Sequence, residues 1–408
     1  MRDFLPADKA RRERVLSTIR SVYRLHGFDE IETPVMEDSS RLSAGLGGDN
    51  EKLAFGVLRR GLTVDDIRSA THGSELCDMG LRYDLTVPLA RFYATNRAEL
   101  APVFRAIQIA PVWRAERPQK GRYRQFVQCD IDIIGEAGVL AEIELITATS
   151  STLAELGITD ATIRINDRRI LFGLLDHFGF NDHESTLITI DKLDKVGVDG
   201  VVAELLERGA SEQSVTSFAD YLNSSTGPTP ATRDGIFAAL PAGVAPEAVE
   251  SLAIIADAVA DTANVQFDPF LVRGMGYYTG AIFEVAHPAL GYSLGGGGRY
   301  DGMIGRFLGT EVPAVGFSLG FERLVDLVTL DDDSETDQAA LVYDPAASLD
   351  EVLAHKRALV ADGTRVRLVA KTKNIRAILT QLERDGYTRY AFVNPGEPLA
   401  WKTIDAAS

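Results

Sequence analysis

Hydrophobic residues in the first 167 positions recur at two different spacings, which predicts a mixture of helices and strands. Over 7–28 they recur every three or four residues, as is typical of an amphipathic helix, and Gly27 is a suitable end for it. Further elements are predicted in chain order: a strand at 29–38, a strand and a helix within 81–96, strands at 101–116 and 122–135, a helix at 139–158 and a strand at 161–167. The strands within 101–135 follow one another closely, so we expect them to pair antiparallel.

The pattern changes at about residue 168. Hydrophobic runs from 168 to 263 have helical spacing and predict a helical insertion, after which strands resume at 265–285. The run 292–303 contains four successive glycines and predicts a turn, whereas 314–328 predicts a strand leading into a helix. Residues 331–338 are polar and predict a linker. Strands and helices then alternate over 339–408, which is typical of a small α/β module with a parallel sheet.

We therefore expect an α+β protein with two domains. The first, 1–330, would hold an antiparallel sheet flanked by helices, with the helical insertion at about 168–263. The second would be the α/β module at 339–408. A chain of 408 residues is long enough for this division.

Composition and charge narrow the class of protein. No apolar run has the length of a membrane span, the first residues lack the features of a signal peptide, and there are only two cysteines, so we expect a cytoplasmic protein without a membrane partner. The net charge is −17, which is unlike a nucleic-acid coat protein. Ten Lys/Arg against eight Asp/Glu give 339–408 a net charge of +2, which leaves −19 for the first 338 residues. This difference in charge between the two parts of the chain is consistent with a nucleic-acid contact at the C-terminal end, or with a chance variation in composition.

The strand within 122–135 carries unusual polar residues. Alternation places Val127, Cys129, Ile131 and Ile133 on a core face, and the opposite face carries Phe126, Gln128, Asp130 and Asp132. Five cations lie within the eleven residues 114–124: Arg114, Arg117, Lys120, Arg122 and Arg124. The polar face either meets solvent or forms a pocket that holds a polyanion beside a cation, since arginine matches phosphate oxygens well.

Four further clusters have both a structural and a functional interpretation. Arg82, Asp84 and Thr86 would share one strand face, and Arg273 is a lone cation in an apolar run that needs a partner if buried. Glycines 295–298 form a flexible hairpin or allow close approach of a ligand. Glu322 and Arg323 would lie in the first turn of a helix, where an anion is favoured. The sequence contains no G-x-x-x-x-G-K-[ST] motif and no G-x-G-x-x-G between a strand and a helix. If the chain binds ATP, it would therefore bind it on an antiparallel sheet.

Several of these segments, in order along the chain, resemble the histidyl-tRNA synthetases, which are class II aminoacyl-tRNA synthetases. VWRAERPQKGRYRQFVQCDIDIIG resembles motif 2 of the class, and FLVRGMGYYTGAIFE resembles the histidine-specific peptide. GFDEIETPVME, with Pro34, resembles motif 1, AVGFSLGFERL resembles motif 3, and RDFLP resembles the N-terminal signature. The resemblance implies a catalytic domain at 1–330 and an anticodon-binding-like domain at 339–408.

The resemblance also implies roles for individual residues. Histidine would be bound by Asp84, Arg114, Gln128, Asp132, Arg273, Tyr277, Tyr278 and Tyr300. ATP would be bound by Arg114, Glu116, Arg122, Phe126 and Arg323. Arg273 and Arg114 would be catalytic, because they stabilise charge on the α-phosphate. The implied substrates and partners are ATP with Mg²⁺, histidine, tRNA(His) and a second copy of the chain, and no metal site is expected from protein ligands alone.

The C-terminal module is shorter than is usual in this family, so we expect it to be truncated and tRNA binding to be weakened. Lys371, Lys373 and Arg376 could still contact phosphates. The leading interpretation is a histidine–tRNA ligase. The alternatives are a regulatory subunit of ATP phosphoribosyltransferase, or another relative that binds histidine without charging tRNA.

Overall fold

The computed structural model describes residues 1–43, 53–117, 121–225, 227–273, 276–329 and 337–404. The chain divides into a larger unit, Met1–Arg2 with Arg14–Thr329, and a smaller unit, Asp3–Glu13 with Leu330–Ser408. Most of the linker predicted at 331–338 lies outside the described residues. Within those residues, no helix has both the length and the apolar character needed to span a membrane.

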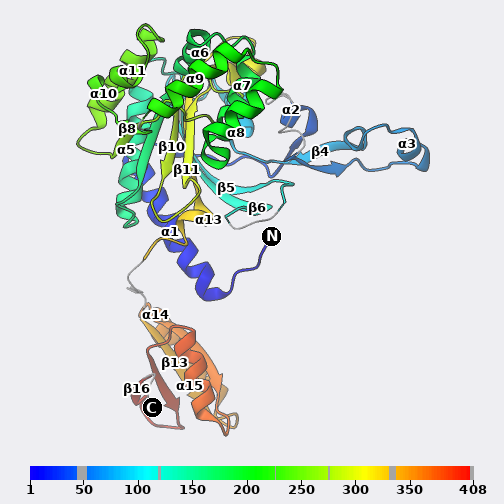
Figure 1. Cartoon of the computed structure of the whole chain (residues 1–408). Coiled ribbons are helices and arrows are strands. Elements are labelled where there is room, and N and C mark those ends of the chain that lie inside the picture. The colour runs from blue at the N-terminus through cyan, green and yellow to red at the C-terminus, as the bar shows by residue number, and fades with distance from the viewer. Residues whose placement is uncertain (44–52, 118–120, 226, 274–275, 330–336, 405–408) are drawn as a thin grey trace. The chain divides into compact units, whose positions relative to one another are not determined.

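A nine-stranded sheet, in the order β1-β5-β6-β12-β11-β10-β7-β9-β8, forms the centre of the larger unit (Figure 1). The strands are β1 Asp29–Glu30, β5 Phe104–Trp113, β6 Gln125–Ile134, β7 Thr162–Asp167, β8 Thr229–Pro230, β9 Val265–Phe267, β10 Ala281–Ala286, β11 Gly295–Arg299 and β12 Ala314–Gly320. Only β1–β5 and β7–β9 pair parallel among these neighbours. The predicted antiparallel pairing of the two strands within 101–135 is confirmed by the register of β5 and β6.

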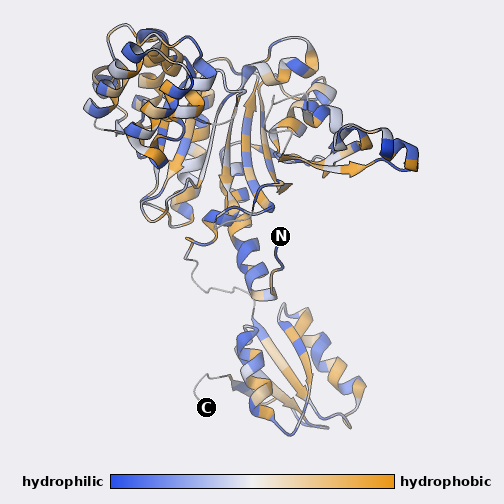
Figure 2. Cartoon of the chain, turned by 45° about the vertical axis from the view of Figure 1, so that its right-hand side comes forward, coloured by the Kyte–Doolittle hydropathy of each residue, from blue (hydrophilic) through white to orange (hydrophobic). Residues whose placement is uncertain are grey.

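The alternation predicted for β6 is also confirmed. Cys129, Ile131 and Ile133 are completely buried on the core face, whereas Val127, at the start of β6, is only half-buried. Helix α1 (Pro6–Leu25) supplies Ile19 and Tyr23 to the core, and the Tyr23 hydroxyl lies 3.5 Å from the carbonyl oxygen of Cys129. Figure 2 shows the resulting distribution, with hydrophobic residues along the central strands and hydrophilic ones on outward helix faces.

Helices surround this sheet. They are α2 Ser39–Ser43, α4 Thr86–Asn96, α5 Leu140–Glu155, α12 Asp301–Leu308 and α13 Phe321–Leu324. Helices are found over 168–263, where the hydrophobic spacing predicts them: α6 Arg168–His177, α7 His183–Ile190, α8 Leu193–Glu207, α9 Glu212–Ser224, α10 Arg233–Ala239 and α11 Pro246–Val259, with the short β8 between α9 and α10. These helices lie together in Figure 1. An arm is formed by β2 Met36–Asp38, β3 Phe55–Leu58, α3 Val64–Ser69 and β4 Cys77–Leu81. The strand predicted at 29–38 is divided in the structure into β1 and β2, whereas β3 and α3 were not predicted.

Two predictions about local structure are wrong. The four glycines predicted as a turn form β11, which pairs on both sides with β10 and β12. Glycine has little strand propensity, but here a side chain would not fit: a Cβ on Gly297 would lie 1.9 Å from the carbonyl oxygen of Gly316. The segment 82–86 is not a strand face, because β4 ends at Leu81 and α4 begins at Thr86.

The smaller unit contains a four-stranded sheet in the order β14-β13-β15-β16. Its elements are β13 Gln338–Tyr343, α14 Leu349–Ala361, β14 Arg365–Ala370, α15 Ile375–Arg384, β15 Arg389–Val393 and β16 Trp401–Thr403. The predicted parallel sheet is confirmed for β13 with β14 and β15, whereas β16 adds an antiparallel strand that was not predicted. Successive β13 residues face different helices: Val342 packs with Leu382 of α15, and Leu341 with Val352 of α14.

Candidate active site

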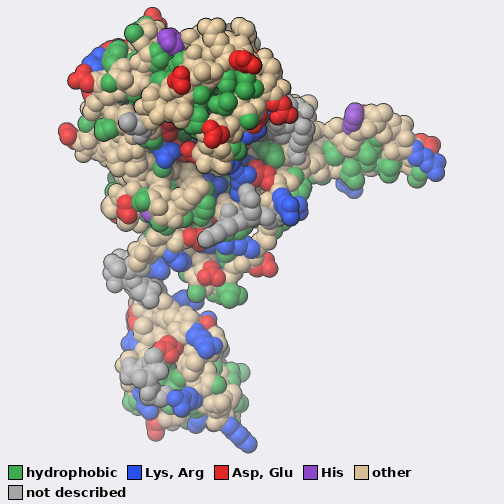
Figure 3. Space-filling view, viewed as in Figure 1, with side chains coloured by type: hydrophobic (Ala, Val, Ile, Leu, Met, Phe, Trp, Pro, Cys, Tyr) green, Lys and Arg blue, Asp and Glu red, His purple; other side chains and the backbone are tan. Residues whose placement is uncertain are grey.

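A cavity of about 250 Å³ opens over the polar face of β6 in the larger unit. All twelve candidate residues line it: Asp84, Arg114, Glu116, Arg122, Phe126, Gln128, Asp132, Arg273, Tyr277, Tyr278, Tyr300 and Arg323. They come from segments far apart in the chain, which the sheet order brings together. In Figure 3, basic and acidic side chains lie side by side in the middle of the larger unit.

Asp132 and Tyr300 form one end of the site. The Tyr300 hydroxyl donates a hydrogen bond of 2.6 Å to Asp132 Oδ1, while Asp132 Oδ2 is buried and lacks a hydrogen-bond partner among the described residues. Burial raises the pKa of Asp132 to about 7, although the hydrogen bond from Tyr300 acts in the opposite direction. Tyr277 stands 6.1 Å from Tyr300 and 4.8 Å from Tyr278 between ring centroids, so three tyrosines surround this end. A carboxylate with one free oxygen among aromatic rings is suited to a ring that carries an N–H.

Asp84 lies in the loop before α4 rather than on a strand. Its Oδ1 accepts a hydrogen bond from the Val87 amide at 3.2 Å, and its buried Oδ2 has no partner within the described part of the chain. Burial raises the pKa of Asp84 to about 6, whereas the Val87 amide and the charge of Arg114 oppose this rise. Gln128 is arranged similarly, because its Nε2 donates to Ser318 Oγ at 2.9 Å and its buried Oε1 lacks a partner there. Asp84 and Gln128 can therefore accept hydrogen bonds from an amine.

Asp130 and Ser318 line the cavity but received no role from the sequence. The Gln128 amide donates to both carboxylate oxygens of Asp130, at 3.4 and 3.3 Å. Burial, and then the negative charge of Asp132, raise the pKa of Asp130 well above its usual value. The alternation of β6 already placed Asp130 on the same face as Asp132, so the sequence could have identified Asp130 as a site residue. Ser318 had none, since only the β6–β12 register sets it opposite Asp130.

Arginines form the other end of the site. The Arg114 guanidinium lies 5.1 Å from the centre of the Phe126 ring, and its Nε donates to the Tyr83 carbonyl at 3.0 Å. Arg122 is half-exposed and 3.8 Å from Glu116. Arg323 donates to the carbonyl oxygens of Gly121 and Ser293. Burial lowers the pKa of Arg323, and the positive charges of Arg122, Arg273 and Arg114 lower it further. These cations repel one another, so an anion with several charges would relieve them.

Arg273 lies between the two ends. Its Nη1 donates to Glu284 Oε2 at 2.8 Å, whereas its buried Nε has no partner among the described residues. Glu284 stands opposite Gly296 in the β10–β11 register, and a Cβ on Gly296 would lie 2.7 Å from the Arg273 guanidinium carbon. The close approach expected at the glycine run is therefore made by a protein side chain. Glu284 thus supplies the partner that a buried Arg273 was expected to need.

Of the other charged residues that the sequence singled out, Arg82, Arg117 and Arg124 do not line the cavity, whereas Glu322 does. Arg82 is buried, and it donates to the carbonyl oxygens of Thr33 and Pro111, at 2.7 and 3.0 Å, so its role is structural. Arg117 and Arg124 are not among the residues that line the cavity, and Lys120 lies outside the described residues. Glu322 does line it, and its carboxylate accepts from Arg2 at 2.8 Å and from the Val127 amide at 3.4 Å.

A mostly antiparallel sheet that presents arginines and buried carboxylates in one cavity has the architecture of a class II aminoacyl-tRNA synthetase. A family model described as histidyl-tRNA synthetase matches residues 1–324. A histidine–tRNA ligase of Leifsonia xyli subsp. xyli is 59% identical over 411 residues, covering 98% of this chain and 95% of the relative. The chain belongs to the histidyl-tRNA synthetase family.

Other comparisons agree with this assignment. A probable histidine–tRNA ligase of Tropheryma whipplei is 44% identical, covering 98% of this chain and 95% of the relative. The crystal structure of a histidyl-tRNA synthetase from Nostoc sp. superposes with a TM-score of 0.78 at 25% identity, covering 99% of this chain and 93% of that one. An ATP phosphoribosyltransferase regulatory subunit/histidyl-tRNA synthetase from Bacillus halodurans has a TM-score of 0.76 at 21% identity and covers 96% of both chains. The last likeness concerns the fold alone.

Proposed function

We propose that this chain is a histidine–tRNA ligase, which activates histidine with ATP and transfers it to tRNA(His). One observation carries the proposal. Asp84 Oδ2, Gln128 Oε1, Asp132 Oδ2 and Arg273 Nε line one cavity, and each is buried without a hydrogen-bond partner among the described residues. Buried polar atoms are nearly always paired, so a substrate with matching donors and acceptors is the natural partner. The family assignment names histidine as that substrate.

The acidic end of the cavity would bind histidine. Asp132 Oδ2 would accept an N–H from the imidazole, and the tyrosines would enclose the ring. Asp84 and Gln128 would accept hydrogen bonds from the α-ammonium group. This arrangement selects histidine because a buried carboxylate rejects side chains that have no N–H to donate.

The basic end would bind ATP. Phe126 would stack on the adenine with Glu116 at its edge, and Arg323 would lie on the other side of the nucleotide. Arg122 would contact the outer phosphates, and its half-exposed position suits a group that leaves as pyrophosphate. Arg114 would hold the α-phosphate and the carboxylate of histidine together, as a planar guanidinium can.

The first step needs no protein nucleophile. An oxygen of the histidine carboxylate attacks the α-phosphorus, a new O–P bond forms, and the bond to the β-phosphate oxygen breaks to release pyrophosphate. Arg273 and Arg114 stabilise the negative charge that develops on the α-phosphate, while binding sets the reacting atoms in line. In the second step a terminal ribose hydroxyl of tRNA(His) attacks the carbonyl carbon, loses its proton, and displaces AMP.

Mg²⁺ would bind mainly through the phosphate oxygens of ATP, because Glu116 would lie at the adenine and Glu322 already accepts hydrogen bonds from Arg2 and the Val127 amide. When bound with ATP, it would neutralise charge on the phosphate oxygens. Among the described residues, no group of three or more His, Cys, Asp or Glu side chains could hold a metal ion by itself. Any Mg²⁺ ligands from the protein would therefore be completed by ATP phosphates and water.

The remaining expectations extend the proposal. Lys371, Lys373 and Arg376 are exposed and would contact tRNA phosphates from the smaller unit. The resemblance of 27–37 to motif 1 supports a homodimer. A cytoplasmic location follows from the need for tRNA and ATP, together with the composition described above.

Histidine-dependent ATP–pyrophosphate exchange, followed by charging of tRNA(His), tests the proposed function. Exchange with charging is the expected result. Exchange without charging would instead indicate a relative that has lost its tRNA. Histidine binding with no exchange would favour a regulatory subunit and would contradict the catalytic role of Arg273.

A further inference from the structure

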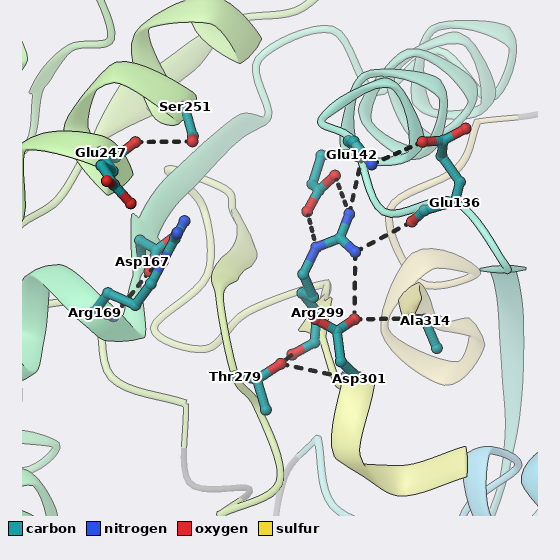
Figure 4. Close-up of polar contacts among 11 residues, drawn as sticks. Glu136, Glu142, Asp167, Arg169, Glu247, Ser251, Thr279, Arg299, Asp301 and Ala314 are labelled. Carbon is teal, nitrogen blue, oxygen red and sulfur yellow. Dashed lines mark hydrogen bonds and ion pairs between the residues drawn. The ribbon is translucent and has the colours of Figure 1, made fainter. Parts of the chain in front are cut away.

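Three charged residues, Glu142, Arg299 and Asp301, form a cluster behind the cavity, which we call the Arg299 cluster (Figure 4). Arg299 and Asp301 flank Tyr300 in the sequence, and Glu142 comes from α5. Tyr300 lines the cavity, whereas the described lining residues include no member of the Arg299 cluster. The cluster therefore acts on a substrate only through the residues that it holds.

Arg299 is held from several directions. Its Nε and Nη2 donate to the two carboxylate oxygens of Glu142, at 2.6 and 2.7 Å. Nη1 donates to the Glu136 carbonyl at 3.2 Å, and Nη2 also donates to the Gly138 carbonyl at 3.1 Å. The side chains of Arg299 and Glu142 are only 11% and 3% exposed. A planar guanidinium with this many partners has one orientation, so the end of β11 is fixed in place.

Asp301 anchors the other side of Tyr300. Its Oδ1 accepts from Arg299 Nη1 at 3.3 Å and from the Ala314 amide at 2.9 Å. The Tyr300 amide donates to the Ala314 carbonyl at 2.7 Å, which ties the tyrosine itself to the start of β12. Tyr300 thus lies between two anchored residues, and its hydroxyl is directed at Asp132.

The same cluster reaches the second tyrosine-bearing segment through Thr279, which directly follows Tyr277 and Tyr278. The Thr279 amide donates to the Arg299 carbonyl at 2.8 Å, and the Thr279 hydroxyl oxygen accepts from the Asp301 amide at 3.2 Å. The two segments that carry the cavity's tyrosines are therefore joined at one point, which is visible in Figure 4.

We propose that the Arg299 cluster positions residues for histidine recognition. It holds the Tyr300 hydroxyl against Asp132 and so fixes the site where the imidazole binds. The proposal rests on the proposed function, since the cluster can position an imidazole-binding site only if histidine binds in this cavity. A buried ion pair is weak support for stability, because desolvation offsets much of its attraction. The Arg299–Glu142 pair instead fixes the orientation of Arg299, the residue directly before Tyr300.

The chain offers a matched control on the same helix. Glu144 of α5 pairs with Arg105 of β5 in the same two-bond geometry, with Nε–Oε2 at 2.6 Å and Nη2–Oε1 at 2.7 Å. Neither of these two residues lines the cavity or flanks a tyrosine within the described residues. Glu144→Gln therefore removes an equivalent charge from α5 without disturbing the tyrosine segments.

The experiment compares Glu142→Gln with Glu144→Gln in histidine-dependent ATP–pyrophosphate exchange. Glu142→Gln should raise KM for histidine by about tenfold to 100-fold, as expected for misplacement of a recognition group by up to about 1 Å. KM for ATP should stay near the wild-type value, and Glu144→Gln should leave both constants near wild type. A partial loss of folded enzyme lowers the apparent kcat but leaves KM unchanged, so the shift in KM separates positioning from stability.

Asp301→Ala provides a second, independent variant, since it removes the anchor on the other side of Tyr300. It should also raise KM for histidine selectively, and it decides the matter if Glu142→Gln does not fold. An unchanged KM for histidine in the folded variants, or an equal rise in KM for ATP, would overturn the proposal. Wild-type protein without histidine-dependent exchange would instead contradict the proposed function.

Discussion

Replacing Gly316 with alanine tests the geometry of the proposed imidazole-binding site most directly. Gly316 of β12 stands opposite Asp132 of β6, and its backbone is that of an ordinary strand. A Cβ at this position would lie 1.9 Å from Asp132 Oδ1, 2.9 Å from Asp132 Cγ and 3.2 Å from Tyr300 Cε1. The perturbation is thus a single methyl group placed against the carboxylate that we assign to histidine.

The size of the effect follows from these distances. Real Cβ atoms essentially never approach another atom more closely than 3.0 Å, so Asp132 Oδ1 must move by about 1 Å or more. A displacement of about 1 Å in a binding group costs on the order of 100-fold in kcat/KM. The added methyl also overpacks a buried site, so the free energy of unfolding should fall by about 1–3 kcal/mol.

ATP–pyrophosphate exchange at varied histidine and at varied ATP measures the effect. We expect a large rise in KM for histidine and little change in KM for ATP. Gly302→Ala, in α12, is the control, because no atom lies within 4 Å of a Cβ at that position. If Gly316→Ala binds histidine as well as wild type does, Asp132 is not the group that recognises the imidazole.

Four further predictions concern catalysis, the pH dependence of histidine binding, the pH dependence of stability, and core packing. Arg273→Ala should lower the rate of adenylate formation by on the order of 100-fold or more, as for loss of one transition-state donor, and near-normal single-turnover rates would contradict its role. Because the pKa values of Asp132 and Asp84 are raised to about 7 and about 6, both carboxyls gain protons as pH falls, so KM for histidine should rise below about pH 7. Asp132→Asn should lose the upper part of that dependence. The same raised pKa values make the ligand-free folded state more stable when the two carboxyls are protonated. This stabilisation is fully present below about pH 4, near the usual pKa of a carboxyl, and is lost as the pH rises to about 7. Melting temperatures measured as a function of pH can check it. Ile131→Ala in the core face of β6 should lower the free energy of unfolding by about 2–5 kcal/mol, measured by denaturant titration, and a loss well below that range would contradict the tight packing of this face.

The sequence pattern predicted the structure correctly where residues close together in the chain decide it. The two faces of β6, its pairing with β5 and the helices over 168–263 were all predictable, because side-chain alternation and helical spacing are properties of short segments. It failed at β11, whose glycines have little intrinsic preference for a strand. The paired strands on both sides override that preference, and they leave no room for side chains.

The sequence by itself determined the family, the kinds of chemical group in the candidate active site and the strand face that carries Phe126, Gln128 and Asp132. Only the tertiary structure decided which of those groups meet. It excluded Arg82 from the cavity, added Ser318 through the β6–β12 register, and placed Glu284 against Arg273. It also placed Glu142 beside Arg299, across 157 positions of the chain. Such contacts depend on strand order and helix packing, which no single segment encodes, because they arise only when distant segments share one core.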